Sequence, residues 1–505
     1  MRDKLKIFFV FLFVVICGNI YAQDFGFGDV DDEGSSDKSF SVSIGGEVSA
    51  TLLGYIDDLS EGASNADLGD IFSGKLNFSA GTSFADGVIN LKIQATDQPI
   101  IVDEAYVRAY FGSFEIEGGL RKLTWGKADS FGPLDVINPL DYSELTDLSD
   151  IMNLKIARPL IHASYRIGSF SKIEGVFVPI FQPLRYAEAG RWEPAQIKML
   201  KNLPNQIKEQ FQAQVQEQLK PLTPLPPILS GMGIPYTLPT PTLTAPTDFD
   251  TPDISTLAYA QAGLRFTTTI GPADIGLQYY YGRLTSPAVS STITTNITYI
   301  TLPPSVPPQI PSQLPTAIDT KIDLNYAYNP YHLIGIDWAQ VLFGFNVRAE
   351  LAANITEDLN GDDPSVYNPT LQWSFGFDRD LFLGINLNFQ CNETIKLMYD
   401  KIGNKTLDNG TSTTMTIDTE EGADLTSTQI IAAISKKFFR DQLELRFAAI
   451  WEIEAKDYLL MPAIIWTRDT VSVELSGGIF GGDTDGQFGQ YYKNNFVKMV
   501  LTYSF

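Results

Sequence analysis

Hydrophobic and polar residues alternate along most of this chain of 505 residues. The segment LQWSFGFD (371–378) has a large apolar side chain at every odd position and a small or polar residue at every even position. The segments LFLGINLNFQ (381–390), FNVRAELA (345–352) and LELRFAAIWE (443–452) repeat the pattern. A period of two is that of a β-strand with one apolar and one polar face, so the chain is predicted to be all-β.

Short clusters of turn residues separate these segments. Eight clusters are short enough for tight connections between antiparallel strands, and they lie at 85–87, 112–113, 168–169, 271–273, 340–343, 379–380, 440–441 and 468–469. Longer connections alternate with them. With both chain ends on the side of the tight turns, eight such turns predict about 18 strands, and 16 fit nearly as well because strand boundaries are uncertain.

A soluble sandwich also alternates, but three features favour a transmembrane, antiparallel, up-and-down β-barrel over residues 39–505. The strands are long, and short turns alternate with long loops, as membrane barrels require. The chain ends in VKMVLTYSF (497–505), an apolar strand that must pair or aggregate. Pairing with the first strand, near 39–54, closes the barrel and leaves room for an aqueous lumen.

The N-terminus predicts export. Residues 1–22 combine basic residues, the apolar run 7–16 and a small residue, Ala22, at a cleavage position, which is the pattern of a signal peptide. Cys17 suggests a lipoprotein, but the bulky residues before it argue against that. Residues 23–38 then form an acidic periplasmic tail, and Cys391 is the one cysteine left, so no intrachain disulfide is expected.

Charge and composition narrow the class further. The net charge of −24 argues against nucleic-acid binding through the overall field of the protein. The aromatic content of 12% argues against a disordered acidic chain.

The polar face of two strands carries a predicted charge ladder. A two-residue turn at Gly112–Ser113 places Glu104 opposite Arg121 and Arg108 opposite Glu117. Opposite charges across neighbouring strands stabilise a sheet modestly. The ladder is therefore either a set of internal struts or a charged wall along a pore, and both roles stay open.

Catalytic and metal sites are not expected. The chain has two histidines, His162 on a polar strand face and His332 at a strand start, and no nucleophile turn accompanies either. The acidic segment 358–363 begins like a calcium loop, but Asp363 and Pro369 stand where that loop needs Gly and Glu. Weak attraction of divalent cations to an acidic rim stays open, and no cofactor is predicted.

Two insertions interrupt the alternation. Residues 183–255 contain a predicted helix (194–220), with an apolar stripe and a kink or break at Pro204, followed by a proline-rich tract. A lid over the barrel mouth is the preferred position for this helix, ahead of the membrane interface and the lumen. Residues 287–320 form a long outer loop, and 292–301 and 318–328 alternate enough to pair as a hairpin above the membrane.

The segment after the ladder resembles a family of bacterial outer-membrane proteins of unknown function. The shared pattern is a strand ending in arginine, then Trp-Gly, an aspartate, Asp-Val-Ile-Asn-Pro and a last aspartate, and here these are Arg121, Trp125, Gly126, Asp129, Asp135, Val136, Ile137, Asn138, Pro139 and Asp141. The family's Arg-Gln pair is Arg121–Lys122 here, which puts any role of that glutamine in doubt. The resemblance implies a porin-like barrel, distantly similar to alginate-export and substrate-selective channels, and implies no catalytic residue.

The same segment predicts a constriction. It lacks the Gly-Lys-Ser/Thr end of a phosphate loop and the spacing of a metal loop. Its Asn-Pro, Gly-Pro and aspartates suit a tight fold-back. We expect 121–125 to form the upper half of a strand with Arg121, Leu123 and Trp125 facing inward. The loop that follows is expected to narrow the lumen with Trp125, Asp129, Asp135, Asn138 and Asp141.

The sequence therefore predicts a porin-like channel of a bacterial outer membrane, for passive or selective passage of small solutes, and not an enzyme. Two alternatives remain: a plugged surface barrel that acts as a structural protein or adhesin, and a transporter of hydrophobic compounds. The expected partners are outer-membrane lipids, the barrel assembly machinery and an unidentified small solute, but no nucleic acid. The protein is expected to be a monomer or a homotrimer.

Overall fold

The computed structural model describes residues 40–57, 66–67, 71–95, 98–148, 151–246, 251–409 and 412–505. The predicted signal peptide (1–22) and acidic tail (23–38) lie outside the described residues.

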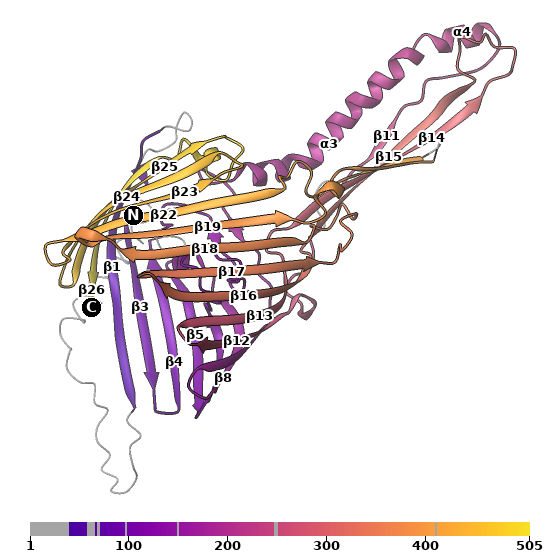
Figure 1. The fold of residues 1–505 in the computed structure, drawn as a ribbon. Helices are drawn as coiled ribbons and strands as arrows, with labels where there is room; N and C mark the ends of the chain where they lie inside the picture. The colour runs from indigo at the N-terminus through magenta and orange to yellow at the C-terminus, as the bar shows by residue number, and fades with distance from the viewer. Residues whose placement is uncertain are drawn as a thin grey trace, which may run out of the picture.

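A closed barrel of antiparallel strands forms the body of the protein (Figure 1). Its main sheet has 19 strands, of which the two-residue β2 (Ala66–Asp67) only pairs beside one end of β1. The other 18 form the wall: β1 (Ser41–Tyr55), β3 (Phe72–Gly81), β4 (Ala85–Gln94), β5 (Ile100–Phe111), β6 (Phe114–Arg121), β8 (Arg158–Ile167), β9 (Ser171–Val178), β12 (Gln261–Ile270), β13 (Ala273–Arg283), β16 (Pro330–Leu342), β17 (Phe345–Thr356), β18 (Thr370–Asp380), β19 (Ile385–Lys396), β22 (Thr426–Phe438), β23 (Leu443–Glu452), β24 (Asp457–Arg468), β25 (Val471–Gly482) and β26 (Phe496–Ser504).

The last strand closes the barrel onto the first. β1 pairs with β26 from Glu47↔Ser504 to Tyr55↔Phe496, and on its other edge it pairs with β3. Each strand of the wall is therefore paired on both sides, which removes the exposed edge of the C-terminal strand. The predicted up-and-down barrel is confirmed, with 18 strands rather than 16.

Eight tight connections form, as predicted, and they lie at one end of the wall, which we call the turn end. Three of them are shifted from the predicted residues, to 82–84, 343–344 and 381–384. At the two-residue turn Gly112–Ser113 between β5 and β6, Gly112 has a φ of +66°, which glycine adopts without strain. One strand prediction is wrong: 381–384 belongs to the connection, where η3 (Phe382–Gly384) precedes β19. Leu383 has a φ of +65° there, so the chain leaves the extended conformation even though its sequence alternates.

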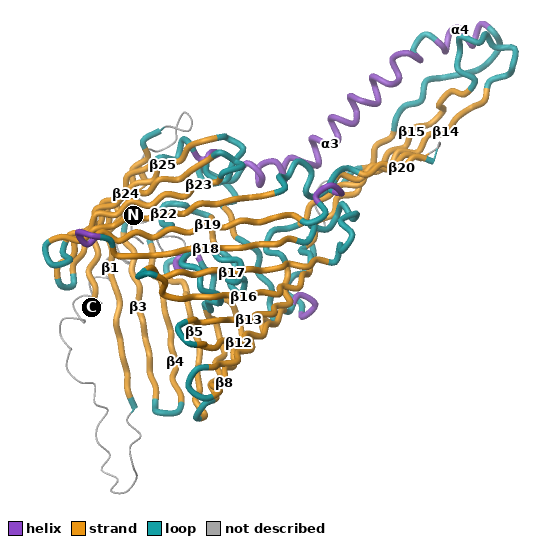
Figure 2. The backbone as a smooth tube through the Cα atoms, viewed as in Figure 1, coloured by secondary structure: helices purple, strands orange, loops and turns teal. Residues whose placement is uncertain are grey.

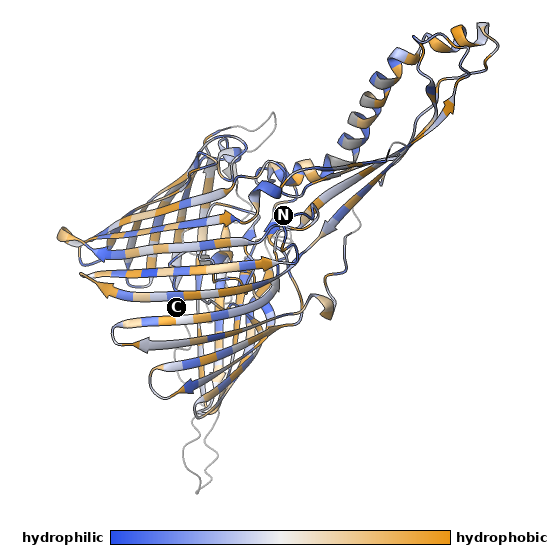
Figure 3. Ribbon diagram, turned by 45° about the vertical axis from the view of Figure 1, so that its right-hand side comes forward, coloured by the Kyte–Doolittle hydropathy of each residue, from blue (hydrophilic) through white to orange (hydrophobic). Residues whose placement is uncertain are grey.

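Apolar side chains cover the outer face of the wall. Figure 3 shows hydrophobic and hydrophilic residues alternating along the barrel strands. On β26, Val497, Met499, Leu501 and Tyr503 are 41–49% exposed, while Lys498 between them points inward to the carbonyl of Thr146. Among the described helices, none is long and apolar enough to cross a membrane.

Loops fill part of the interior and form two buried apolar clusters against the wall. One cluster joins β1 and β23–β26 to loop residues, among them Leu145, Trp192 and Tyr491. The other joins β8, β9, β13 and β16 to Trp125, Leu134 and Ile137. Both clusters lie toward the end of the long connections, which we call the loop end.

An arm projects from the loop end (Figure 2). It contains most of α3 (Ala195–Leu219), η1 (Lys220–Leu222), α4 (Leu225–Gly231) and a sheet in the order β11 (Thr242–Thr244), β15 (Gln313–Ala327), β14 (Ala288–Thr301), β21 (Ser412–Ile417) and β20 (Lys405–Asp408). The arm has a buried apolar cluster of its own, formed by Leu225, Leu229, Tyr236, Leu302 and Leu314.

The structure shows how the two insertions fold. α3 runs through Pro204 without a break, so of the two effects predicted for that proline the break does not occur. The first turns of α3 lie over the barrel mouth, and the rest of the helix runs along the arm (Figure 1). Most of the predicted outer loop 287–320 belongs to β14 and the start of β15, and the predicted hairpin forms with the register Ala288↔Ala327.

Candidate functional site

The connection between β6 and β8 folds into the barrel. We call it the inner loop (residues 122–157, of which 149–150 lie outside the described residues), and it contains β7 (Asp141–Tyr142) and α2 (Ile151–Leu154). β6 ends at Arg121, so Lys122–Trp125 belong to this loop and not to the upper half of the strand as predicted. The backbone turns here because Asn138 accepts a hydrogen bond from the N–H of Leu123 (2.8 Å) and donates to the carbonyl of Arg121 (3.0 Å).

A buried carboxylate on the opposite wall anchors the inner loop. Glu350, on the inward face of β17, is 3% exposed and accepts hydrogen bonds from the backbone N–H groups of Lys127, Ala128 (2.7 Å) and Leu134 (3.2 Å). Gly126 and Gly132 leave the space for it, because a Cβ on either residue would collide with the carboxylate. Several N–H groups converging on one carboxylate form a strong, oriented contact.

A second anchor lies beside the first on β17 and β19. The side-chain oxygen of Gln390 accepts hydrogen bonds from the N–H groups of Asp129 and Ser130, each at 3.1 Å. The carboxylate of Asp129 in turn pairs with Arg348 and accepts a hydrogen bond from Asn388 (3.0 Å). The tip of the inner loop is therefore fixed across the lumen rather than standing free at the loop end.

Three of the five predicted constriction residues lie inside the packing of the loop. Trp125 is 2% exposed and packs against Gly263 of the wall. Asp135 forms an ion pair with Lys155 at 2.6 Å, both largely buried, and Asn138 is 4% exposed. These side chains hold the loop in its fold and do not face open space. A loop inside a barrel needs such a core of its own, and the narrowing of the lumen by this loop stays a prediction.

The other two predicted residues keep polar contacts at the loop surface. Asp129 is partly exposed beside Arg348, as described above. Asp141 accepts hydrogen bonds from the N–H and hydroxyl of Ser143 (3.0 and 2.5 Å) and pairs with Arg185 at 2.7 Å. Asp141 thereby joins β7 to the parallel strand β10 (Arg185–Tyr186).

The charge ladder has the predicted register but different partners. Arg108 lies opposite Glu117, and Arg121 reaches Glu104 at 2.7 Å. Arg108, however, binds both oxygens of Asp86 on β4 at 3.2 Å, since a planar guanidinium matches a carboxylate in two contacts. Glu104 and Glu117 are 9% and 4% exposed, so the upper part of the ladder consists of struts under the inner loop.

His162 extends the ladder onto β8 and β9. Its ring nitrogens lie 3.0 Å from Glu117 and 3.3 Å from Glu174, and Lys172 pairs with Glu174 at 2.8 Å. Sequence analysis placed His162 on an inward face but missed Glu174 as its second partner. His332 lies on the outer face, where its ring stacks on Tyr279 and hydrogen-bonds to the Tyr279 hydroxyl at 2.8 Å.

The acidic segment 358–363 is a capped turn. The carboxylate of Asp358 accepts hydrogen bonds from the N–H groups of Asp362 (3.1 Å) and Asp363 (2.9 Å). In the described parts of the chain, no three His, Cys, Asp or Glu side chains are grouped to hold a metal ion.

The inner wall opposite the ladder is apolar at middle height. The register of β22–β24 places two apolar levels on the inner face, Ile431, Ile450 and Leu459 at one level and Ala433, Ala448 and Met461 at the next. Gln429, Glu452 and Asp457 lie on the loop-end side of this band, and Ser435, Arg446 and Ala463 lie on its turn-end side. Ile431 and Met461 are only partly buried and pack against the first apolar cluster. This apolar band, which we call the uncharged side, lies opposite the ladder and between two levels of β22–β24 that carry charged residues.

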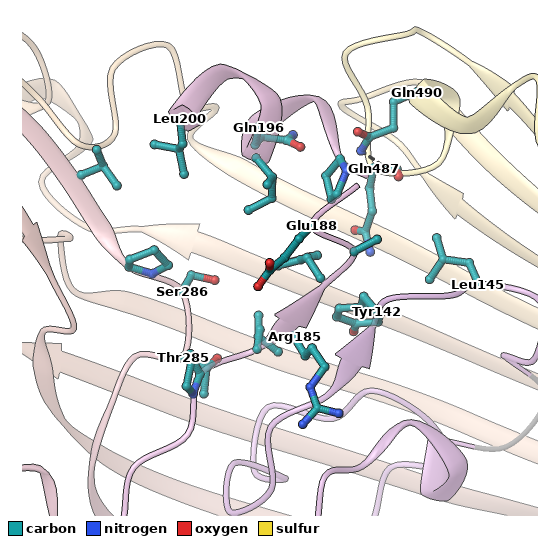
Figure 4. A pocket seen from close by; sticks show the side chains of 18 of the residues that line it. Tyr142, Leu145, Arg185, Glu188, Gln196, Leu200, Thr285, Ser286, Gln487 and Gln490 are labelled. Atoms are coloured by element: carbon teal, nitrogen blue, oxygen red, sulfur yellow. Dashed lines mark hydrogen bonds between the residues drawn. The ribbon is translucent and has the colours of Figure 1, made fainter. Parts of the chain in front are cut away.

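A cavity of about 980 Å³ opens at the loop end above this uncharged side. We call it the mouth chamber. The first turns of α3 cover it with Gln196 and Leu200, and Tyr142 and Glu188 lie across from them (Figure 4). Its aromatic lining comes from five connections between wall strands, one of which includes β15 of the arm: Phe131, Tyr142, Tyr186, Tyr326, Tyr328, Tyr367, Phe488 and Tyr491.

The tyrosines of the mouth chamber are uncharged. Burial raises the pKa of Tyr142 and of Tyr186 above the ordinary value for a phenol, and it raises the pKa of Tyr367 to about 12. The rings of Tyr142 and Tyr186 stack with centroids 5.9 Å apart, and the Tyr367 hydroxyl donates to the carbonyl of Pro287 at 2.9 Å. The rings are therefore held in place as flat apolar surfaces.

Sequence analysis also missed the residues that anchor the inner loop. Arg348 and Glu350 were assigned to a polar strand face, and Gln390 to another, without a role. A glutamate in the middle of a strand, on the inner face, does predict an anchoring contact, because a buried carboxylate needs a hydrogen-bonding or charged partner. Nothing in the local sequence says that the partner is a loop more than 200 residues away.

The comparison with solved structures gives alignments over most of the chain at low identity. The outer membrane channel DcaP of Acinetobacter baumannii aligns at 11% identity with a TM-score of 0.39, over 93% of this chain and 100% of that chain. A porin variant of Rh. blastica aligns at 10% identity and a TM-score of 0.36, over 92% and 100%. OmpF of Salmonella typhi, in a complex with daunomycin, aligns at 8% identity and a TM-score of 0.37, over 92% and 97%.

Comparison of the sequence with protein families and with curated proteins finds no match. The family resemblance of residues 121–141 therefore stays a prediction.

Proposed function

We propose that this protein is a porin-like channel of a bacterial outer membrane through which small solutes pass. The observation that carries the proposal is the closed 18-stranded wall, apolar outside and lined by charged residues inside. An apolar outer face suits lipid, and closure satisfies the backbone groups of every strand there. Under this proposal the inner loop narrows the interior, because its tip is bonded to Glu350 and Gln390 of the wall.

The exposure of charged side chains on the inner face of the barrel supports a water-filled interior. The side chains of Lys75, Glu47, Arg108 and Arg348 are 44%, 34%, 28% and 24% exposed, although they point to the inside of the barrel. Charged groups in a dry interior would be strongly destabilising. We infer that water fills the turn-end half of the barrel and that solute passes beside the tip of the inner loop.

Planar-bilayer recording tests the channel. Purified full-length protein should produce stepwise increases in conductance in potassium chloride. A folded, heat-modifiable sample that gives no current at any voltage would overturn the proposal.

The ionic selectivity tests the proposed path. Arg348→Gln removes the partner of Asp129 and Asp378 and leaves two carboxylates beside the path. The preference for cations, measured as the reversal potential in a salt gradient, should rise roughly twofold or more. Lys436→Gln is the control, because Lys436 lies on the outer face over the ring of Phe438. Equal reversal potentials for both variants would place the path elsewhere.

The arm favours a second function. A projection with its own buried cluster, standing away from the barrel, suits attachment to another surface. Under this alternative the barrel is only a support, and the bilayer recording separates the two, because a support need not conduct.

A further inference from the structure

The mouth chamber has the size and the lining of a binding site for a small molecule. Its volume of about 980 Å³ is near the upper end of the range for sites of drug-sized ligands. The tyrosine rings offer flat faces on which another ring can stack.

The polar part of the lining is almost free of net charge. Gln182, Gln196, Gln429, Gln487 and Gln490 supply amides that both donate and accept hydrogen bonds. Two lining residues carry a formal charge, Arg185 and Glu188. Arg185 pairs with Asp141 at 2.7 Å, and its guanidinium points away from the roof formed by Gln196 and Leu200 (Figure 4). A ligand here meets amides and phenols rather than a cluster of charges of one sign.

The chamber continues into the uncharged side of the barrel. Ile450 and Gln429 belong both to the chamber lining and to the inner faces of β23 and β22. Ile431 lies beside Ile450 at the same level, and Ala448 and Met461 lie one level closer to the turn end. A molecule leaving the chamber in that direction passes this apolar band, with the charged wall across from it, before it reaches the level of Arg446.

We propose that the mouth chamber binds uncharged amphipathic solutes, which combine an aromatic or aliphatic ring with hydroxyl or amide groups, before they move along the apolar wall. The ring stacks on the tyrosines, and the polar groups bond to the glutamine amides. A solute with a full negative charge is disfavoured, because it would lose its hydration beside phenol rings and Glu188, and the one cation of the lining, Arg185, is already paired with Asp141. This assignment rests on the channel proposed above, since it names the solute class of that channel.

The test uses three probes that together vary the aromatic ring, the hydroxyl groups and the charge. 4-Nitrophenyl β-glucoside has a ring and hydroxyl groups and no charge, 4-nitrophenyl phosphate is charged, and glucose lacks the aromatic ring. Calorimetric titration of the full-length protein should detect the glucoside and find each of the other two at least about tenfold weaker. In planar bilayers the glucoside should interrupt the current in a concentration-dependent manner.

Variants in the roof locate the site. Leu200→Glu puts a carboxylate into the chamber and should weaken glucoside binding about tenfold. Met199→Glu, at a lining position that is 54% exposed and so tolerates the change, should weaken it in the same direction. Gln212→Glu adds the same charge to an exposed position farther along α3 and should leave binding unchanged. Equal effects at all three positions would overturn the assignment.

The failures of the two proposals are distinguishable. A protein that conducts ions but binds the glucoside no better than the phosphate keeps the channel and overturns the chamber assignment. A folded protein that binds the glucoside selectively but passes no current overturns the channel and keeps the chamber as a binding site.

Discussion

At the scale of single residues, the interior is organised by a few carboxylates that bind backbone. Glu350 receives three N–H groups of the inner loop, and Asp358 receives two of its own turn. Asp457, fully buried on β24, receives the N–H groups of Phe488 (2.5 Å) and Gly489 (3.0 Å) in the same way. Each of these carboxylates fixes a connection to the wall or to itself, so the charge inside the barrel is partly structural.

Glu350→Gln should release the tip of the inner loop. The amide keeps one accepting oxygen but loses the charge and turns an N–H₂ group toward backbone donors, which should cost about 2 kcal/mol locally. Trypsin should then cut at Lys127 while the barrel stays heat-modifiable on a gel. Glu47→Gln is the matched control, since Glu47 is an inward carboxylate that pairs with Lys75 at 3.0 Å. An unchanged digestion pattern would contradict the anchoring role.

At the scale of elements, the arm and the wall are stabilised differently. The wall is held by strand pairing around the whole ring, whereas the arm has one five-stranded sheet and a small cluster under α4. Leu229 and Leu314 are fully buried in that cluster. The arm should therefore unfold separately, with a lower free energy of unfolding than the barrel.

Leu314→Ala tests this separation. Removing a fully buried leucine side chain should destabilise the arm by about 2–5 kcal/mol. Limited proteolysis should cut residues 220–240 first, and the barrel should keep its heat modifiability. Leu407→Ala, on β20, changes a leucine that is 72% exposed and should behave like the wild type. Loss of the folded barrel in Leu314→Ala would show that the two parts fold as one unit.

Elements with a strict local pattern could be predicted from the sequence, and contacts between distant loops could not. The wall was predictable because each strand must alternate between two environments, and the Gly112–Ser113 turn defines the register of its two strands. The inner loop was expected to enter the lumen, but which of its residues face open space depends on Glu350 and Gln390, 223 and 261 residues away from their partners. No local period encodes such pairs, so the sequence could not show that Trp125 and Asp135 are buried in the core of the loop.

At the scale of the whole molecule, the outer face of the barrel should decide whether the protein inserts into a bilayer. Apolar residues on β1, β8, β12 and β26 are exposed over most of the ring, as with Ile161 at 52% and Leu264 at 59%. In water such a belt would drive aggregation. In a bilayer these apolar side chains contact lipid tails instead of water, while the inward polar side chains stay hydrated.

Placing a charged residue on the outer face should therefore impair insertion far more than placing the same residue on the inner face. Ile161→Arg places a charge on the outer face near the middle of β8, where lipid-facing arginine costs about 2–4 kcal/mol. Asn77→Arg adds the same charge near the middle of β3, on the inward face beside Asn90. Folding into vesicles, followed by urea titration of the heat-modifiable fraction, should show a lower midpoint for Ile161→Arg and little change for Asn77→Arg. The opposite order would mean that the wall faces water outside and lipid or protein inside, and a channel could not be built on it.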